Sequence, residues 1–421
     1  MIESPFTVRN LSRIVARHRK EDSKDLKAEC DLVARKILEQ IESGTVFHAA
    51  TEKFLINNKT VLRYTTEGAS VASSLIVRNL EINARIKQPN RNEIISALIS
   101  SLQDGTPYRI HRYDIKNFYE SINRSAVITI LEDEGLCSLK TLKLIRALFK
   151  TFEKDGIKGL PRGLNISAYL SEIYLKNFDT KLRRLEHVNF YARFVDDIII
   201  LTSNDQADET TNHVKGYLSN DLTLHDDGKR ADIYIEKSET DTRESIHSGR
   251  FETFNYLGYE FNIFNTYLSS SDFRIKRKVE VEISKNKIKK IKSRLFSSLL
   301  SYHSSSKMSV DYKLLLKRLK TLTGNYEIHS SGTNKKIKTG IYFNYHHRTP
   351  RKNCRLSELD RTFQRSLFSQ SHPLFSRISK SFSIQEKREI SKFSFVTGFR
   401  KITYYSFSYK ELSEIRKYWN N

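Results

Sequence analysis

The segment FYARFVDDIIILT, at residues 190–202, places two adjacent acids between two strongly β-forming runs. The residues on either side are mostly aromatic or β-branched, which favours strands that are buried on at least one face. Asp196 and Asp197 therefore fall at the junction of two strands. Carboxylates in such a poorly solvated place need a compensating cation. The pair predicts either a metal-binding strand–turn–strand or, as the alternative, a solvated hairpin tip.

A second strand upstream also ends at an acid. Asp114 lies in RYDIKNFYESI, residues 112–122, where an apolar and aromatic run precedes a turn or helix that starts near Glu120 and Ser121. Two strands that each deliver a carboxylate can share metal ions. Asp114 therefore favours the metal site over the solvated tip.

Three further segments follow a fixed order around these acids. In GLPRGLNISAYLSEIYL, residues 159–175, glycines and a proline form a loop that leads into a helix starting near Asn165 or Ser167. A lysine follows the acid pair in LTLHDDGKR, residues 222–230, and a glycine interrupts the aromatic run FNYLGYEF, residues 254–261. The order is thus strand acid, glycine loop with helix, acid pair, lysine, and aromatic turn.

This order resembles motifs A to E of reverse transcriptases, over about residues 90–265. The run SAYLSEIYLKNFD at residues 167–179, with no proline after Ser167, is similar to bacterial abortive-infection and defence-associated (unknown-group) reverse transcriptases, which are related to retron and group II intron enzymes. Two residues depart from the commoner pattern. Phe194 stands where a tyrosine usually precedes x-Asp-Asp, and Arg162 stands where a glutamine often occurs in Leu-Pro-x-Gly.

The resemblance implies an α+β fold of the right-hand polymerase type. Residues 1–107 are expected to form the N-terminal part of the fingers, and residues 108–265 the palm, with a helical fingers insertion at about 125–155. Residues 266–421 are expected to form a thumb-like, mainly helical region that binds nucleic acid. Within it, residues 273–300 are interpreted as one basic amphipathic helix. A length of 421 residues fits several packed subdomains.

The composition points to a polyanionic partner. Lysine and arginine number 72 against 49 acidic residues, a formal charge of +23, which favours phosphate contacts, with a membrane surface as the alternative. Basic and aromatic residues interleave at 342–348 and 393–419, where they can stack on bases or form ordinary core. No apolar run of about 18 residues and no secretory signal is seen, so we expect a cytoplasmic protein without a membrane partner. The three cysteines lack C-x-x-C spacing and predict neither disulfide nor zinc.

Nucleotidyl transfer requires two divalent ions about 3.5–4 Å apart. Asp114 and Asp196 are the predicted ligands, and Asp197 is expected beside them, because adjacent strand residues point to opposite faces and cannot chelate equally. The resemblance adds the backbone carbonyl of Ile115. Magnesium prefers hard oxygen ligands, so two Mg²⁺ ions are the expected cofactor, with Mn²⁺ as a substitute.

Other residues are assigned to the nucleotide and the primer through the resemblance. Tyr119 matches the steric gate that excludes a ribose 2′-hydroxyl, or is a core aromatic. Arg162 and Gly163 line the loop that would face the nascent base pair. Lys229 matches the lysine that protonates departing pyrophosphate. Lys237 is close enough in sequence to compete with Lys229 for this role. Arg78 and Arg91 are favoured over Lys59 and Arg63 as ligands of the triphosphate. The residues Leu257, Gly258 and Tyr259 are either a primer grip or packing residues.

The resulting functional hypothesis is an RNA-directed DNA polymerase that uses dNTPs to make cDNA on an associated non-coding RNA, in defence against phage. One alternative keeps the active site but makes DNA without a template, primed from a protein hydroxyl. Another, of a different class, is an inactive RNA-binding or phage-sensing protein on a polymerase scaffold. The intact acids argue against this last alternative, and the oligomeric state is left open.

Overall fold

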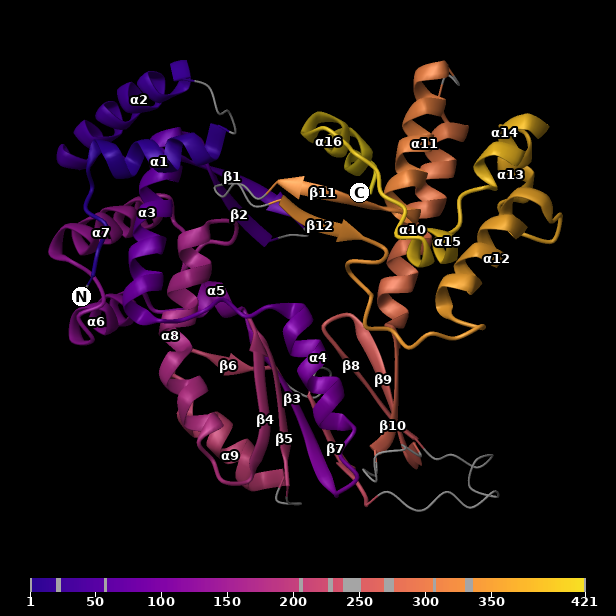
Figure 1. Cartoon of the computed structure of the whole chain (residues 1–421), viewed down its shortest axis with the longest axis horizontal. Coiled ribbons are helices and arrows are strands. Elements are labelled where there is room, and N and C mark those ends of the chain that lie inside the picture. Colours follow the sequence, from indigo (N-terminus) through magenta and orange to yellow (C-terminus); the bar gives the residue numbers. More distant parts are fainter. Residues whose placement is uncertain are drawn as a thin grey trace. The chain divides into compact units, whose positions relative to one another are not determined.

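The computed structural model of the protein describes residues 2–19, 24–56, 59–203, 207–225, 230–237, 251–268, 276–305, 308–329 and 336–419. The chain divides into two compact units (Figure 1). The first unit comprises residues 1–238 with 331–334, and the second comprises residues 239–330 with 335–421. The predicted mixture of antiparallel sheets and helices is confirmed.

The first unit begins with helices and a two-stranded hairpin that precede the main sheet. These elements are α1 (Val8–Arg19), α2 (Lys24–Glu42), β1 (Thr51–Ile56), β2 (Lys59–Tyr64), α3 (Glu67–Ala84) and α4 (Arg91–Leu102). Thr66 caps α3 by accepting a hydrogen bond from the amide of Ala69, and Asn90 caps α4 in the same way through Asn92. The two caps fix the residues at which α3 and α4 begin.

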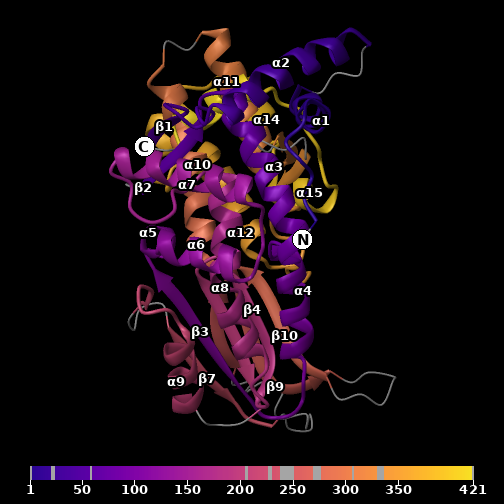
Figure 2. The same ribbon diagram turned by 90° about the vertical axis from the view of Figure 1, so that its left-hand side faces the viewer.

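The first unit contains a five-stranded antiparallel sheet (Figure 2). Its central strand is β3 (Tyr108–Lys116), which pairs with β5 (Asp197–Thr202) on one side. On the other side β3 pairs with β7 (Ala231–Ile235) over its first half and with β6 (Thr223–Leu224) at its end. The edge strand β4 (Val188–Phe194) pairs with β5.

One face of this sheet is buried against helices. Ile198 and Ile200 of β5, with Tyr113 and Ile115 of β3, enter the large core of the first unit. The same core includes side chains of α5 (Phe118–Ser121), α6 (Arg124–Asp133), α7 (Leu139–Lys154), α8 (Asn165–Arg183) and α9 (Ala207–Tyr217). Each fully buried isoleucine or leucine contributes roughly 1.5–3 kcal/mol. Strand alternation therefore places Asp114 and Asp197 on the opposite face.

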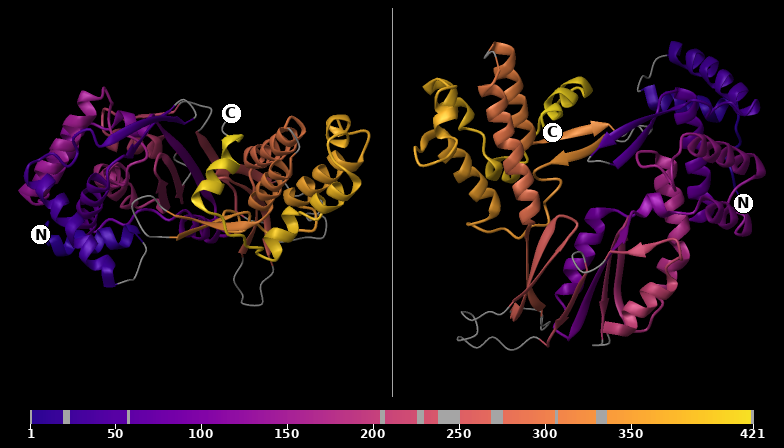
Figure 3. Two further views of the ribbon diagram at one scale, coloured as in Figure 1. Left: turned by 90° about the horizontal axis from the view of Figure 1, so that it is seen from above. Right: turned by 180° about the vertical axis from the view of Figure 1, so that it is seen from behind.

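The second unit combines a three-stranded sheet, a hairpin and a helical core (Figure 3). The sheet has the order β10-β9-β8, from β8 (Phe251–Tyr256), β9 (Tyr259–Leu268) and β10 (Lys276–Ile283). The other elements are α10 (Lys285–His303), α11 (Ser309–Thr323), β11 (Asn325–His329), β12 (Lys336–Gly340), α12 (Arg355–Phe368), α13 (Phe375–Ser379), α14 (Ile384–Ile390), α15 (Phe395–Arg400) and α16 (Tyr409–Lys417). Strand β9 crosses the expected palm–thumb boundary at residue 265, and the predicted domain limits remain predictions.

The prediction of one amphipathic helix over residues 273–300 is wrong in its first half. Lys276–Ile283 is a strand in which Arg277, Val279, Val281 and Ile283 are buried alternately. This period of two residues fits a half-buried strand and not the 3.6-residue period of a helix. Residues 273–275 lie outside the described residues. The basic helix is α10, which begins after Ser284.

Three predictions from composition can be compared with the described residues. None of the described helices has the length and apolar character needed to cross a bilayer. Cys30 and Cys354 are buried and Cys137 is half-buried, all three as free thiols. In the C-terminal segment, the Arg348 guanidinium lies 4.4 Å from the ring centre of Phe399, and Arg348 is buried, so these residues pack together within the second unit.

Candidate active site

Asp196 lies on the two-residue turn between β4 and β5, and Asp197 is the first residue of β5. Phe194 pairs with Asp197, so Val195 and Asp196 form the turn itself. Val195 has φ of 61°. A β-branched residue with positive φ is an outlier. Such strain costs about 1–3 kcal/mol and persists only where the surroundings hold it. The turn is therefore held in place by its neighbours.

Three carboxylates meet at this turn. Asp114 lies opposite Asp197 in the β3–β5 register, and the amide of Ile115 donates to the carbonyl of Asp196 at 3.0 Å. Burial raises the pKa of Asp196, and the negative charges of Asp114 and Asp197 raise it further. Asp114 itself is only 7% exposed. The predicted meeting of the two strand acids is therefore present in the structure.

Two side chains that the sequence analysis missed bind these acids. Arg112 Nη2 lies 2.8 Å from Asp197 Oδ1, and His225 Nε2 lies 3.3 Å from Asp114 Oδ1. Arg112 stands two residues before Asp114, hence on the same face of β3. This spacing is the feature of the sequence that could identify Arg112, because it brings Arg112 beside Asp197 once Asp114 and Asp197 are paired. His225 follows β6, and its amide donates to the carbonyl of Asp114 at 2.8 Å.

The donors at the turn fit a divalent metal that keeps other ligands. Among the described residues, no group of three or more His, Cys, Asp or Glu side chains is arranged to hold a metal by itself. Magnesium is commonly held by one or two carboxylates together with waters and substrate phosphates. Asp114 and Asp196, with the carbonyl of Ile115, supply only oxygen ligands. A cation would also relieve the mutual repulsion that raises the pKa of Asp196.

Tyr119 lies on the short helix α5, directly after the strand that carries Asp114. Its ring centre is 5.2 Å from the guanidinium carbon of Arg162. Arg162 in turn binds Glu120 through two bonds, Nε to Oε1 at 2.8 Å and Nη2 to Oε2 at 3.2 Å. Bidentate pairs of this kind fix orientation as well as adding energy. Glu120 therefore holds Arg162 against the predicted gate residue.

The glycine loop is shaped by contacts within the chain. A Cβ at Gly163, where φ is 94°, would come within 3.0 Å of the Leu62 carbonyl oxygen in β2. The Leu62 amide also donates to the Arg162 carbonyl at 2.7 Å. A Cβ at Gly159 would come equally close to the Tyr119 carbonyl oxygen, which accepts a hydrogen bond from the Leu160 amide. The loop thus joins the β1–β2 hairpin to α5 through backbone contacts that only glycine permits.

Residues 87–261 match the family described as "Reverse transcriptase (RNA-dependent DNA polymerase)". The matched range contains the three carboxylates, Tyr119 and the glycine loop in the geometry above. Residues 87–261 are thus similar to a reverse transcriptase domain. This is an enzyme family, that of RNA-directed DNA polymerases, which are nucleotidyltransferases.

Solved telomerase structures are similar to the chain at low identity. Apo telomerase from Candida tropicalis, truncated from its C-terminal domain, shares 15% identity with a TM-score of 0.31, over 61% of this chain and 49% of that one. Telomerase from Candida albicans with a fragment of telomeric RNA shares 12% identity with a TM-score of 0.34, over 83% of this chain and 54% of that one. The chain thus spans about half the length of these proteins. No curated protein sequence matches the chain.

A cavity of about 500 Å³ lies beside Arg162 in the reverse transcriptase domain and the preceding hairpin. Lys53, Lys59 and Lys158 line it together with Glu120 and Arg162. Of the four cations considered for the triphosphate, Lys59 is the one on this cavity. Arg63 is exposed and paired with Glu52 at 3.2 Å. Arg78, exposed on α3, and Arg91, at the start of α4, do not line this cavity, and their assignment to the triphosphate stays a prediction.

The lysine assignment is resolved only in part. Lys229 lies outside the described residues. Lys237 follows β7, whose last residue, Ile235, is opposite Tyr108 at the far end of β3 from Asp114. Six residues of strand separate Tyr108 from Asp114, a distance of about 20 Å. Lys237 is therefore a poor candidate for pyrophosphate protonation, and Lys229 remains the predicted residue.

The predicted primer grip is a tight hairpin turn in the second unit. Tyr256 pairs with Tyr259, and the two turn residues Leu257 and Gly258 have φ of 44° and 85°. Two positive φ values are typical of the type I′ turn, which suits hairpins. Tyr259 is fully buried and donates its hydroxyl hydrogen to the Asn344 carbonyl at 3.1 Å. Tyr259 is thus a packing residue, while Leu257 and Gly258 stay candidates for the primer.

Proposed function

We propose that the protein is an RNA-directed DNA polymerase that makes cDNA by two-metal nucleotidyl transfer. The observation that carries the proposal is the meeting of Asp114, Asp196 and Asp197 at one turn of a reverse transcriptase domain. Asp114 and Asp196, with the Ile115 carbonyl, would hold two Mg²⁺ ions. When bound, these ions activate the primer 3′-hydroxyl and neutralise the triphosphate.

Other residues of the chain would tune the metal ligands and bind the nucleotide. Arg112 neutralises Asp197, which leaves Asp114 and Asp196 as the stronger metal ligands. Tyr119, pressed by Arg162, closes the side of the sugar where a 2′-hydroxyl would lie. Lys59 and Arg162 supply positive charge to the adjoining cavity, where phosphates of a dNTP would be attracted. Lys229 would protonate the departing pyrophosphate.

The proposed partner is RNA. The formal charge of +23 supports a polyanion that is held through its phosphates. An associated non-coding RNA as template, a role in bacterial defence against phage and a cytoplasmic location are supported by the resemblance of residues 167–179 to abortive-infection and defence-associated enzymes. These finer assignments belong to the proposal.

The direct test is dNTP incorporation by purified protein with Mg²⁺ and an RNA template annealed to a DNA primer. We expect template-dependent extension that Asp114→Asn and Asp196→Asn each abolish, while Glu39→Gln, on the exposed face of α2, has no effect. Extension that persists in both active-site variants would contradict the assignment. Absence of any synthesis with a folded parent would favour the inactive RNA-binding alternative.

A second candidate function is DNA synthesis without a template, primed from a protein hydroxyl. The observation that favours it is Arg162 in place of glutamine, bound to Glu120. Sequencing the nucleic acid that copurifies with the protein separates the two candidates. One RNA with complementary DNA supports templated synthesis. Protein-attached DNA of random or homopolymeric sequence, without enriched RNA, supports the second candidate.

A further inference from the structure

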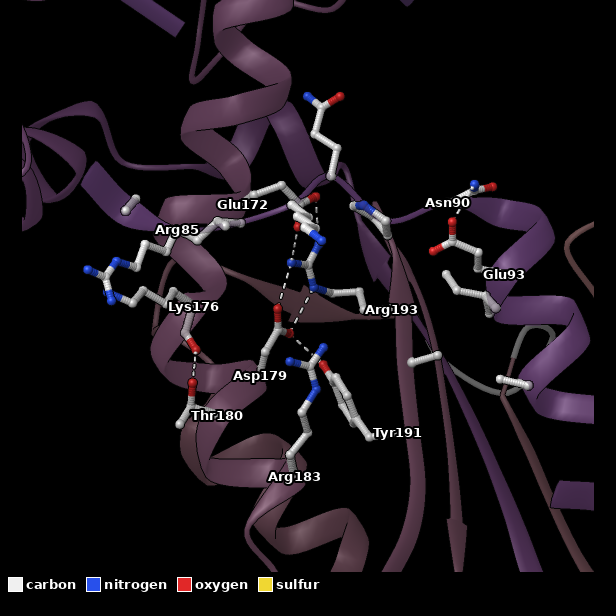
Figure 4. Close-up of a pocket in the computed structure, with 18 of the residues that line it drawn as sticks. Arg85, Asn90, Glu93, Glu172, Lys176, Asp179, Thr180, Arg183, Tyr191 and Arg193 are labelled. Atoms are coloured by element: carbon white, nitrogen blue, oxygen red, sulfur yellow. Dashed lines mark hydrogen bonds and ion pairs between the residues drawn. The ribbon is translucent and has the colours of Figure 1, made fainter. Parts of the chain in front are cut away.

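A cavity of about 640 Å³ lies along the edge strand β4 (Figure 4). Residues of α8, β4, α4 and the segment 84–90 line it. Arg193 of β4 lies between Glu172 and Asp179 of α8, as Figure 4 shows. The side chain of Arg193 is 2% exposed, and those of Glu172 and Asp179 are 8% and 13% exposed. A charged cluster is thus buried directly behind the catalytic turn.

Arg193 uses all of its hydrogen-bond donors. Nε and Nη2 donate to Asp179 at 2.9 and 2.8 Å, and Nη1 and Nη2 donate to Glu172 at 3.2 and 2.6 Å. Nη1 also donates to the backbone carbonyl of Val195 at 3.0 Å. A guanidinium has five N–H groups, and each has an acceptor here. Arg193 therefore has no donor left for a ligand in the cavity.

The bond to Val195 reaches the turn that carries Asp196. Val195 has positive φ, a conformation that requires support from its surroundings. The other backbone bond to the turn comes from the opposite strand, through the Ile115 amide to the Asp196 carbonyl. Arg193 and Ile115 thus hold consecutive carbonyls of the turn. Movement of either would displace the Asp196 carboxylate relative to Asp114.

We propose that Arg193 is a positioning residue that sets the place of Asp196 for metal binding. Glu172 and Asp179 fix the guanidinium plane, and the guanidinium fixes the Val195 carbonyl. Lysine cannot replace it, because an ammonium has three donors and lacks the planar fork that engages two carboxylates and a carbonyl together. This proposal adds a residue role to the proposed function, and its test by primer extension rests on that function.

The competing explanation is that the cluster serves stability alone. Disruption of a buried cation with two carboxylates destabilises a protein whatever the role of the cluster, because the remaining charges stay buried without a partner. A merely structural cluster would alter melting temperature and the yield of folded protein. It would not change the metal dependence of the folded fraction. Metal affinity is therefore the measurement that separates the two explanations.

The experiment compares Arg193→Lys with the parent and with Arg183→Lys as a matched control. Arg183 lines the same cavity, and its guanidinium carbon lies 5.2 Å from the ring centre of Tyr191. Mn²⁺ binding to the metal-free protein is measured by electron paramagnetic resonance, and Mg²⁺ dependence and dNTP KM by primer extension. Circular dichroism establishes that each variant is folded.

For Arg193→Lys we expect Mn²⁺ affinity and kcat to fall by about 10–100-fold, the loss typical when a partner of a metal ligand is removed. The Mg²⁺ concentration at half-maximal rate should rise while the dNTP KM changes little. Arg183→Lys should match the parent. Parental Mn²⁺ affinity in folded Arg193→Lys, or an equal loss in Arg183→Lys, would overturn the proposal.

The experiment also decides the proposal if Arg193→Lys does not fold or if the parent makes no DNA. If Arg193→Lys does not fold, Asp179→Asn is measured, since it leaves the turn untouched and removes one charge that fixes the guanidinium. A smaller loss of Mn²⁺ affinity supports the proposal, and parental affinity overturns it. If the parent binds Mn²⁺ but makes no DNA, the proposed function fails, while the Mn²⁺ comparison still decides the role of Arg193.

Discussion

Asp114 of β3 lies directly opposite Asp197 of β5, and Asp197 is also bound by Arg112 at 2.8 Å. The two adjacent acids, Asp196 on the turn and Asp197 at the start of β5, thus have unequal environments. The pKa of Asp196 is raised by burial and by the two neighbouring negative charges, and the positive charge of Arg162 only partly opposes this shift. Neutralisation by Arg112 weakens Asp197 as a metal ligand, whereas Asp196 gains most from a cation.

The first prediction concerns the two acids of the turn. We expect Asp196→Asn to lower kcat of dNTP incorporation by more than about 100-fold, because it removes a charge that stabilises the transition state. Asp197→Asn should lose only about 10–100-fold, since it acts beside the ligands. Steady-state primer extension measures both. Equal losses would show that Arg112 does not distinguish the two acids.

The second prediction concerns the stability of the metal-free protein. A carboxyl whose pKa is raised by folding contributes stability that is present below its unfolded pKa and is lost as pH rises through its folded pKa. The parent therefore loses this contribution as the pH rises. Asp196→Asn cannot ionise, so we expect its Tm at neutral pH to exceed the parental Tm.

The pH series provides the check on that reasoning. The difference in Tm between Asp196→Asn and parent should shrink as pH falls toward 4, and Mg²⁺ at pH 7 should stabilise the parent more than the variant. Glu39→Gln, at an exposed position of α2, serves as the control and should follow the parent at every pH. A difference in Tm that is independent of pH would rule out charge repulsion as its cause.

Part of this site could be predicted from sequence, and part depends on contacts between distant elements. Asp114, Asp196 and the glycine loop have local signatures, since acids that end apolar runs and glycines before a helix are visible in the chain. Arg193 has none, because its partners Glu172 and Asp179 lie on a helix whose packing against β4 brings them together. Its role follows only from the tertiary structure.

The error at residues 276–283 has a physical origin as well. The basic residues of KRKVEVEI suggested the start of the lysine-rich helix that follows, and the charge pattern outweighed the alternation of Arg277, Val279, Val281 and Ile283. Burial of Arg277, which donates to Asn265 at 2.9 Å, shows that charge does not mark the solvent side here. The two-residue periodicity of residues 276–283 therefore indicates the strand, whereas the charge pattern does not.

The third prediction tests the gate. Tyr119→Ala should raise incorporation of ribonucleotides relative to deoxynucleotides by about 100-fold, roughly what a pocket that must reject an added hydroxyl achieves. Arg162→Gln and Glu120→Gln should each relax the same ratio by a smaller factor, because Glu120 holds Arg162 on the Tyr119 ring. Single-nucleotide kcat/KM values for both sugars give the ratio. Arg63→Gln, exposed on β2, is the control and should keep the parental ratio.

The fourth prediction concerns the glycine loop. Gly163→Ala should destabilise the first unit by about 1–3 kcal/mol, because its Cβ would meet the Leu62 carbonyl and its φ of 94° is unfavourable for alanine. Gly44→Ala, which also has positive φ but has nothing within 4 Å of its added Cβ, separates backbone strain from the steric clash. Urea denaturation measures both. Equal destabilisation by the two substitutions would mean that contact with the β1–β2 hairpin is unimportant.

The fifth prediction concerns RNA binding. If phosphate contacts dominate, affinity for single-stranded RNA should fall by about 10³-fold or more between 50 and 200 mM salt. Lys289 and Lys290 are exposed on α10, so substituting both by glutamine should reduce the slope of log affinity against log salt by about 1–2, as expected for two lost phosphate contacts. The matched control is glutamine at Lys143 and Lys150, exposed on α7. Fluorescence anisotropy across a salt series gives both slopes. An equal reduction of the slope in the two double variants would show that net charge, and not the α10 surface, attracts the RNA. An affinity that does not depend on salt would contradict the proposal that phosphate contacts hold the RNA.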